Sequence, residues 1–252
     1  AVEDARRVCQ MIGIPHYTLN FQDVFEKEVI GNFCYEYQRG RTPNPCIVCN
    51  KKIKFGTLLE KAYSLDAQYL ATGHYVRVVY RGRYLLYKGR DGQKDQSYAL
   101  YSLTQEQLAH SLFPLGDLTK GETRQKAAQL GLRIADKPDS QEICFIPDDD
   151  YRRFLREYAP QTLQPGPICD GEGHVLGQHE GIAFYTIGQR RGLGITAPHP
   201  LYVVDIIPET NTVVVGEDRF VFGQNLTVED VNFISIPYLT EPLQVEAKIR
   251  YN

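Results

Sequence analysis

The chain has 252 residues, with 28 basic and 31 acidic side chains and a formal net charge of −3, and 42% of its residues are hydrophobic. This composition is typical of a globular protein and excludes collagen-like, fibrous and low-complexity chains. No run reaches the roughly 18 to 20 apolar residues of a membrane helix, and the first residues do not form a signal peptide. We therefore expect a cytoplasmic protein without membrane contact, built from about two domains.

Helical patterns and short apolar runs alternate along the first part of the chain. The helical patterns cover residues 5–12, 24–33 and 53–62, and the apolar runs typical of buried strands cover residues 14–19 and 69–73. Such alternation predicts a parallel α/β sheet, in which ligands bind at the carboxyl ends of the strands. His74 directly follows one of these ends.

A hairpin with many basic residues is predicted next. Residues 76–80 and 84–87 flank a turn at Arg81 and Gly82, and residues 77–96 contain six basic side chains, two acidic ones and three tyrosines. The net charge argues against general coating of nucleic acids, but this local surface could follow a phosphate backbone. A solvated hairpin face is the alternative.

Three helices and a β-rich second half complete the predicted elements. Residues 102–105 and 119–122 offer capping boxes for two helices, and residues 150–158 form a third, with acidic residues 148–150 at its start. Strands at 201–207 and 212–215 form a hairpin around Pro208, and residues 248–252 read as part of a further strand. We expect a domain boundary between residues 139 and 167.

The chemistry of the chain points to its cysteines. Cys46 and Cys49 form a Cys-x-x-Cys pair where a helix is predicted to begin, and Lys51 and Lys52 follow, so both thiols are expected to favour the thiolate form. Zinc binding, sulfur chemistry and a purely structural pair remain open on spacing alone. Cys144 is the obvious second functional sulfur, and we assign no chemistry to the remaining cysteines.

A Gly-rich basic segment, residues 188–195, could bind phosphate or RNA through backbone N–H and guanidinium groups, although turns between strands use the same residues without a ligand. Together with this segment, several motifs occur in one order along nearly the whole chain. They are residues 40–45, 49–51, 71–75, 94–98, 139–146 and 186–194. In this combination the chain closely resembles the bacterial-type tRNA-specific 2-thiouridylases.

The resemblance implies a sulfurtransferase that places sulfur on C2 of the wobble uridine of tRNA anticodons. ATP, with Mg²⁺, adenylates the C2 oxygen of the uracil, and a cysteine persulfide charged by a donor protein supplies the sulfur. Cys144 matches the persulfide cysteine, and Cys49 matches the nucleophile that resolves it through a transient disulfide. Gly73 matches an ATP-binding glycine. The positions that match tRNA or base contacts are Asn44, Pro45, Cys46, His74, Lys94, Asp95, Gln96, Arg250 and Tyr251.

The implied fold is α/β, with a parallel sheet like that of the adenine-nucleotide alpha-hydrolases (a PP-loop, Rossmann-like domain), a small central β-rich domain and a C-terminal β-barrel. On this basis residues 1–147 form the catalytic domain, 148–204 a tRNA-binding domain and 205–252 part of the barrel. The family's Ser-Gly-Gly-Val-Asp-Ser loop is absent from this sequence. We therefore expect the chain to lack the start of the catalytic domain and the end of the barrel, and to bind ATP poorly by itself.

Alternatives remain for the cysteines and for the function. Because Cys46 is a third thiol, Cys46, Cys49 and Cys144 could ligate a [4Fe–4S] cluster. A noncatalytic RNA-binding module stabilised by zinc is a function of a different class, and a related ATP pyrophosphatase acting on another base is a third. The resemblance favours the thiouridylase, acting as a monomer on one tRNA.

Overall fold

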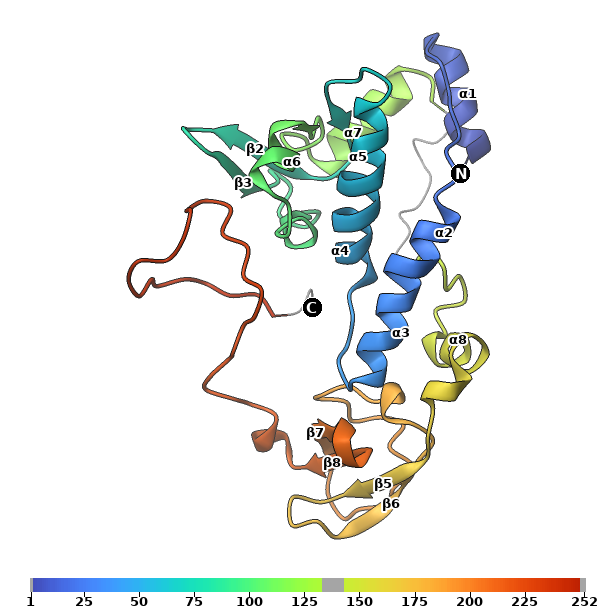
Figure 1. The fold of residues 1–252 in the computed structure, drawn as a ribbon, viewed down its shortest axis with the longest axis vertical. Helices are drawn as coiled ribbons and strands as arrows, with labels where there is room; N and C mark the ends of the chain where they lie inside the picture. The colour runs from blue at the N-terminus through green and yellow to red at the C-terminus, as the bar shows by residue number, and fades with distance from the viewer. Residues whose placement is uncertain (1, 133–142, 250–252) are drawn as a thin grey trace. The chain divides into compact units, whose positions relative to one another are not determined.

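The computed structural model describes residues 2–132 and 143–249 (Figure 1). The described chain forms two compact units, each built from separate stretches of sequence. The first unit contains residues 2–25, 46–132 and 230–249, and the second contains residues 26–45 and 143–229. Among the described residues, no helix has both the length and the apolar character needed to cross a bilayer.

The first unit holds most of the helices. Its elements are α1 (Val2–Ile12), α2 (Gln22–Phe25), α4 (Pro45–Cys49), α5 (Leu58–Tyr63), β1 (Leu70–Ala71), β2 (Val76–Tyr80), β3 (Tyr84–Lys88), α6 (Gln105–Ala109), β4 (Ser111–Leu112) and α7 (Lys120–Gln129). Pro45, the first residue of α4, belongs to the second unit by its packing. The predicted helix at the start of the chain is confirmed and ends before Gly13, whose φ is +73°.

A long helical run carries the Cys-x-x-Cys pair. Helix α4 continues without a break through the π-helical segment η2 (Asn50–Thr57) into α5, as Figure 1 shows. Proline suits the first turn of a helix because the N–H that it lacks would have no partner there. The predicted helix at 53–62 is therefore confirmed, and it begins earlier and contains a π-helical turn that the sequence did not indicate.

The parallel sheet is much smaller than predicted. Strands β1 and β4 pair in parallel over two residues each, Leu70 with Ser111 and Ala71 with Leu112. The expected strand at 14–19 is wrong: these residues form no strand, and Ile14 and Tyr17 are exposed. Without a neighbouring strand the run has no ladder to join, and its Pro15 carries no N–H for one.

The predicted hairpin and caps are close to those observed. Strands β2 and β3 are antiparallel, with Val76 opposite Lys88 and Tyr80 opposite Tyr84. The capping box of Thr119 and Glu122 is confirmed at the start of α7. That of α6 uses Thr104 and Gln107, two residues later than predicted, because Thr104 has the extended backbone that a cap requires.

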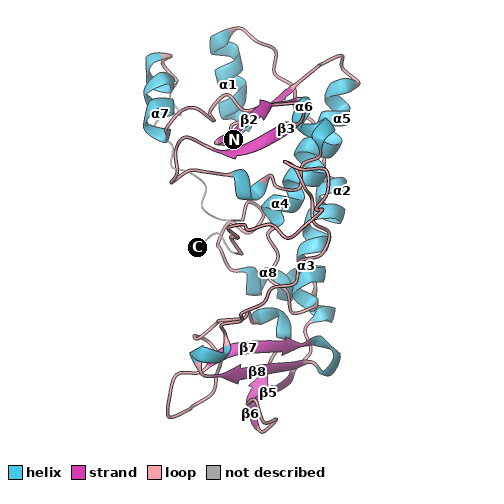
Figure 2. Cartoon of the chain, turned by 90° about the vertical axis from the view of Figure 1, so that its left-hand side faces the viewer, coloured by secondary structure: helices cyan, strands magenta, loops and turns pink. Residues whose placement is uncertain are grey.

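The second unit combines two helices with a four-stranded sheet. Its elements are α3 (Gly31–Gln38), α8 (Tyr151–Tyr158), β5 (Gly166–Cys169), β6 (Val175–His179), β7 (Tyr202–Ile207) and β8 (Thr212–Gly216), with the π-helical segment η1 (Glu26–Ile30) leading into α3. The strand order is β6-β5-β8-β7, visible in Figure 2, and only the pair β5–β8 is parallel. Helix α8 confirms the prediction, with Asp150 accepting from the Arg153 N–H at 2.9 Å.

The expected C-terminal barrel is not formed by the described residues. Strand β8 and the end of β7, which the resemblance placed in that barrel, instead complete the sheet of β5 and β6. No described residue after Gly216 belongs to a strand, so the strand expected near residue 248 is also wrong for residues 248 and 249. Most side chains of this last segment are exposed, and a strand needs neighbours for its backbone groups.

Each unit has its own apolar core. In the first unit Phe55, Val76, Leu100, Leu103 and Leu108 form one buried cluster. The core of the second unit centres on Phe33, Leu155 and Ile168 and the inner side chains of β7 and β8. The long helix therefore reaches the first core through Phe55, which comes six residues after Cys49.

Leu108→Ala should lower the free energy of unfolding by about 2–5 kcal/mol, because it leaves a cavity in this core. Leu108 is 1% exposed, whereas Leu112, four residues later, is 47% exposed. Leu112→Ala is the matched control and should cost less than about 1 kcal/mol. Urea unfolding followed by circular dichroism measures both values, and equal losses in the two variants would contradict the proposed core.

Candidate functional site

The Cys-x-x-Cys pair lies at the start of the long helix, as predicted. Cys46 is exposed and Cys49 is half-buried, and both belong to α4. Lys51 and Lys52 are exposed one turn later. Backbone N–H groups at a helix start and nearby ammonium groups both favour a thiolate over a thiol. The local structure is therefore suited to nucleophilic sulfur chemistry.

His74, predicted to contact tRNA, is packed inside the first unit. Its side chain is 7% exposed, and its ring centroid lies 6.0 Å from that of Phe55 and 6.3 Å from that of Phe113. Its Nδ1 lies 2.8 Å from the Thr72 hydroxyl. Burial lowers the pKa of His74 to about 4, and the positive charge of Lys54 adds to the shift. The imidazole is thus neutral at pH 7.

The loop containing Lys94, Asp95 and Gln96 is held by its own acidic and amide side chains. The Asp95 carboxylate accepts hydrogen bonds from the Gly89 N–H at 3.0 Å and from the Ser97 N–H and hydroxyl at 3.2 and 2.8 Å. The Gln96 side-chain oxygen accepts from the Tyr75 N–H at 3.0 Å, and the Gln96 backbone N–H donates to the Tyr75 carbonyl at 3.2 Å. Asp95 and Gln96 therefore shape the loop that contains the half-buried Lys94.

Some cations of the basic hairpin are engaged within the protein. Arg83 donates to the carbonyls of Phe233 and Ile234 at 3.0 and 2.7 Å, and Arg90 donates to the Asp117 carbonyl and to Glu122. Arg81 and Lys88 are exposed on the hairpin. The surface available to a phosphate backbone is therefore smaller than the sequence suggested.

In the second unit, two recognised motifs are joined. The hydroxyls of Thr42 and Thr186 lie 2.9 Å apart, linking the segment before Asn44 to the segment before the Gly-rich loop. Gly40 has φ +66°, and a Cβ there would lie 2.6 Å from Ile206 Cγ2. Only glycine fits this backbone and this close approach. Asn44 is exposed at the end of the anchored segment.

The Gly-rich loop is a folded turn of the second unit. The Gly188 N–H donates to the Val203 carbonyl at 2.8 Å, and the Val203 N–H donates to the Gln189 carbonyl at 2.9 Å. Arg190 and Arg191 are exposed on it. These backbone groups are therefore used within the protein, whereas the two guanidinium groups face solvent.

Cys144, the predicted persulfide residue, is exposed in a turn of the second unit. Arg250 and Tyr251 lie outside the described residues, as does the beginning of the motif at 139–146.

Gly73 is exposed, and a Cβ added to it would make only an ordinary contact, 3.7 Å from Leu115. The fold itself therefore does not require glycine at Gly73, which leaves its predicted role in ATP binding untested.

Two other cysteines, Cys34 and Cys169, belong to the second unit. Cys34 and Cys169 are buried, and burial raises the pKa of the Cys34 thiol, which makes it a poor nucleophile. Within residues 2–132 and 143–249, no three side chains of histidine, cysteine, aspartate or glutamate gather as metal ligands. The zinc and iron–sulfur alternatives remain predictions.

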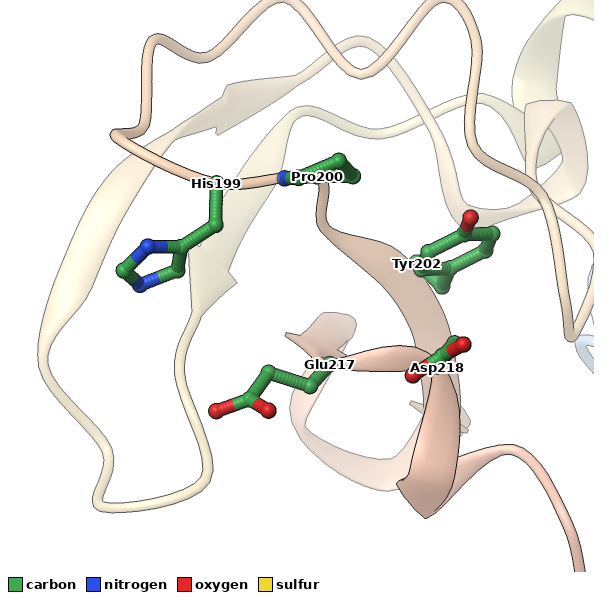
Figure 3. A pocket seen from close by; sticks show the side chains of 5 residues that line it. All are labelled: His199, Pro200, Tyr202, Glu217 and Asp218. Carbon is green, nitrogen blue, oxygen red and sulfur yellow. The ribbon is translucent and has the colours of Figure 1, made fainter.

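Two surface pockets lie elsewhere. One, of about 330 Å³, belongs to the second unit (Figure 3) and is lined by His199, Pro200, Tyr202, Glu217 and Asp218. Another, of about 420 Å³, lies in the first unit between the hairpin and α6, where Arg77 and Tyr84 contribute to its wall. None of the predicted site residues lines either pocket.

One residue beside the thiols was missed. Asn50, directly after Cys49, is 2% exposed, and its side-chain N–H donates to the Ala99 carbonyl at 3.1 Å. Buried side-chain amides nearly always have a hydrogen-bond partner. From the sequence, Asn50 could have been noticed only as an asparagine on the apolar face of the predicted helix. Its partner is 49 residues away and could not be read from spacing.

Comparison with known proteins identifies the family. The chain matches the tRNA methyl transferase HUP domain over residues 1–148 and the tRNA methyl transferase PRC-barrel domain over residues 152–217. It is 57% identical over 256 residues to the tRNA-specific 2-thiouridylase MnmA of Heliobacterium modesticaldum and 55% identical over 254 residues to that of Halothermothrix orenii. The chain belongs to the tRNA-specific 2-thiouridylase family. The family predicted from the motifs is thus confirmed.

The alignments cover the whole chain but only part of each relative. They span 100% of this chain and 66% and 71% of the two relatives, and a third relative, the tRNA-specific 2-thiouridylase MnmA 1 of Caldanaerobacter subterraneus, is 56% identical with 70% of its length covered. A HUP domain and a PRC-barrel domain fit the α/β class that was predicted. The three domain boundaries and the individual site residues stay predictions.

Because His74 is buried, the free energy of unfolding should depend on pH. Between its folded pKa of about 4 and its ordinary 6.5, the unfolded chain binds a proton that the folded chain does not. Stability contributed by neutral His74 is therefore complete above pH 6.5 and decreases as the pH falls toward 4, by up to about 3 kcal/mol.

His74→Phe keeps an aromatic ring but cannot titrate. The difference in unfolding free energy between parent and variant, from urea unfolding at several pH values, should shift in favour of the variant on going from pH 7 to pH 4. A difference that stays constant over this range would show that the folded and unfolded chains bind the His74 proton equally, and that burial does not lower its pKa.

Proposed function

We propose that this protein is an ATP-dependent sulfurtransferase that converts the wobble uridine of tRNA anticodons to 2-thiouridine. The observation that carries the proposal is identity of 53–57% to relatives named tRNA-specific 2-thiouridylase along the whole chain. The name of the matched domains refers to methyl transfer. A half-buried Cys49 near the start of a helix and an exposed Cys144 support sulfur transfer instead, because the helix start favours the thiolate of Cys49 and exposure leaves Cys144 open to a sulfur donor.

The proposed chemistry uses two thiols. A donor protein leaves a persulfide on Cys144. The Cys49 thiolate attacks the Cys144 sulfur of this persulfide, which forms a Cys49–Cys144 disulfide and releases hydrosulfide. Hydrosulfide adds to C2 of the uracil, whose oxygen leaves with AMP. Two external thiols, or one dithiol, then reduce the disulfide and are themselves oxidised to a disulfide. ATP, with Mg²⁺, supplies only the leaving group, and Gly73 is the residue of this chain proposed to contact it.

The RNA side of the proposal rests on the cationic surface of each unit. Arg81 and Lys88 on the hairpin and Arg190 and Arg191 on the Gly-rich loop are exposed and carry the charge that attracts a phosphate backbone. An anticodon loop is single-stranded, so its target base leaves the stack at low cost. Asn44, Pro45 and Cys46 are proposed to contact this base. We further propose that the protein acts in the cytoplasm as a monomer.

Cys49→Ser and Cys144→Ser should each abolish 2-thiouridine formation, because serine can neither carry nor resolve a persulfide. The test is mass spectrometry of wobble nucleosides from a thiolation-deficient cell that expresses the full-length parent gene or its variants. Cys9→Ser is the matched control, since Cys9 lies in α1 at intermediate exposure and has no proposed chemistry. It should retain the parent level.

The same experiment separates Cys46 from the other two thiols. Cys46→Ser should retain part of the activity if Cys46 only contacts the base, and lose all of it if Cys46 is a cluster ligand. A folded parent protein that yields no 2-thiouridine would overturn the proposed function. A metal analysis showing stoichiometric zinc would then favour the noncatalytic RNA-binding module.

A further inference from the structure

Asn50 is a buried polar side chain directly beside the proposed nucleophile. It is 2% exposed, follows Cys49 in the chain and is the first residue of the π-helical segment η2. π-Helical turns inside α-helices are rare and are frequently found at functional sites. Its side-chain N–H donates to the Ala99 carbonyl at 3.1 Å, and both residues belong to the first unit.

The Ala99 carbonyl connects Asn50 to the loop of Lys94, Asp95 and Gln96. The Ala99 N–H donates to the Gln96 carbonyl at 3.0 Å. Gln96 is in turn bonded twice to Tyr75, the neighbour of His74. One continuous set of hydrogen bonds therefore runs from the turn that carries Cys49 to the loop that contains Lys94.

The second polar atom of the Asn50 amide is not satisfied. Its Oδ1 is buried and accepts no hydrogen bond from the described protein. A buried acceptor without a partner destabilises a fold, and an apolar side chain of similar size would avoid the cost. Stability alone therefore does not explain an asparagine at this position. The hydrogen bond from its side-chain N–H to the Ala99 carbonyl has another explanation: it fixes the helical turn that carries Cys49, which we call the thiol turn, against the loop of Lys94, Asp95 and Gln96.

We propose that Asn50 is a positioning residue for Cys49. Its hydrogen bond to Ala99 holds the turn carrying Cys49 in register with the Lys94–Gln96 loop, so that the thiol and the tRNA-contacting loop keep one geometry. The proposal rests on the proposed function. It assigns to Asn50 no contact with the substrate, and its effect should appear in the rate of the reaction and in the exposure of the Cys49 thiol.

Asn50→Asp is the main test, because aspartate has the same shape but presents only acceptors to the Ala99 carbonyl. In the full-length protein this variant should lower kcat for 2-thiouridine formation by at least about tenfold, since small misplacements of reacting groups are costly, with KM for tRNA nearly unchanged. Asn50→Ala, which removes both the donor and the unsatisfied oxygen, should fold as well as the parent and show the same loss of kcat.

The matched control is Asn232→Asp. The Asn232 side-chain N–H also donates to carbonyls of the first unit, those of Tyr101 and Leu103 at 2.7 and 2.9 Å, but it makes no hydrogen bond to Asn50 or to the Ala99 carbonyl. This variant should leave kcat and KM within about twofold of the parent, because the hydrogen bond between Asn50 and Ala99 stays intact in it. If both asparagine variants reduced kcat equally, a general loss of stability would explain the result and the proposal would fail.

A second measurement is independent of activity. In a Cys46→Ser, Cys144→Ser background, alkylation of Cys49 by iodoacetamide should be faster by about threefold or more in Asn50→Asp and Asn50→Ala, because a loosened turn opens more often. An unchanged alkylation rate would overturn the positioning role. If the parent protein makes no 2-thiouridine, the proposed function fails, and the alkylation rates still decide whether Asn50 fixes the thiol turn.

Discussion

Burial of Phe55 is the constraint on which the first unit depends. Its ring packs in the cluster with Val76, Leu100, Leu103 and Leu108, and it lies beside His74. Its carbonyl also accepts a hydrogen bond from Gln107 at 2.7 Å. Because Phe55 lies on the same continuous helix as Cys49, packing of one aromatic ring fixes the helix that presents the thiols. Burial of apolar surface therefore sets the position of the polar chemistry.

Polar groups near the candidate site mostly serve the fold before they can serve a ligand. Asp95 orders its own loop, Arg83 fastens the segment near residue 233 to the hairpin, and His74 is buried and neutral. The family resemblance implied RNA contacts for Asp95 and His74, and the charge of the hairpin suggested one for Arg83. In the described structure Asp95 orders the loop around Lys94, and Arg83 belongs to the hairpin that carries Arg81.

Helices and strands could be predicted from the sequence where the residues that determine them are close together in the chain. The capped helices, the hairpin of β2 and β3 and the pair β7 and β8 were predicted because turn residues, caps and periodicity lie within a few residues of each other. The strand at 14–19 was wrong and β4 was missed, since a strand forms only where a second strand meets it. The hydrogen bonds of Thr42 with Thr186 and of Asn50 with Ala99 could not be predicted, because they join residues far apart in the chain.

The sequence by itself determined the family, through motifs whose order and chemistry are specific, and it located the Cys-x-x-Cys pair at a helix start. Only the tertiary structure decided that His74 is buried, that the buried Asn50 bonds the Ala99 carbonyl and that β5 to β8 share one sheet. The physical reason is that burial and hydrogen bonding of a side chain depend on which distant segments pack around it. The local sequence shows which interactions a side chain is able to make. Packing against distant segments decides which of these interactions it makes in the folded protein.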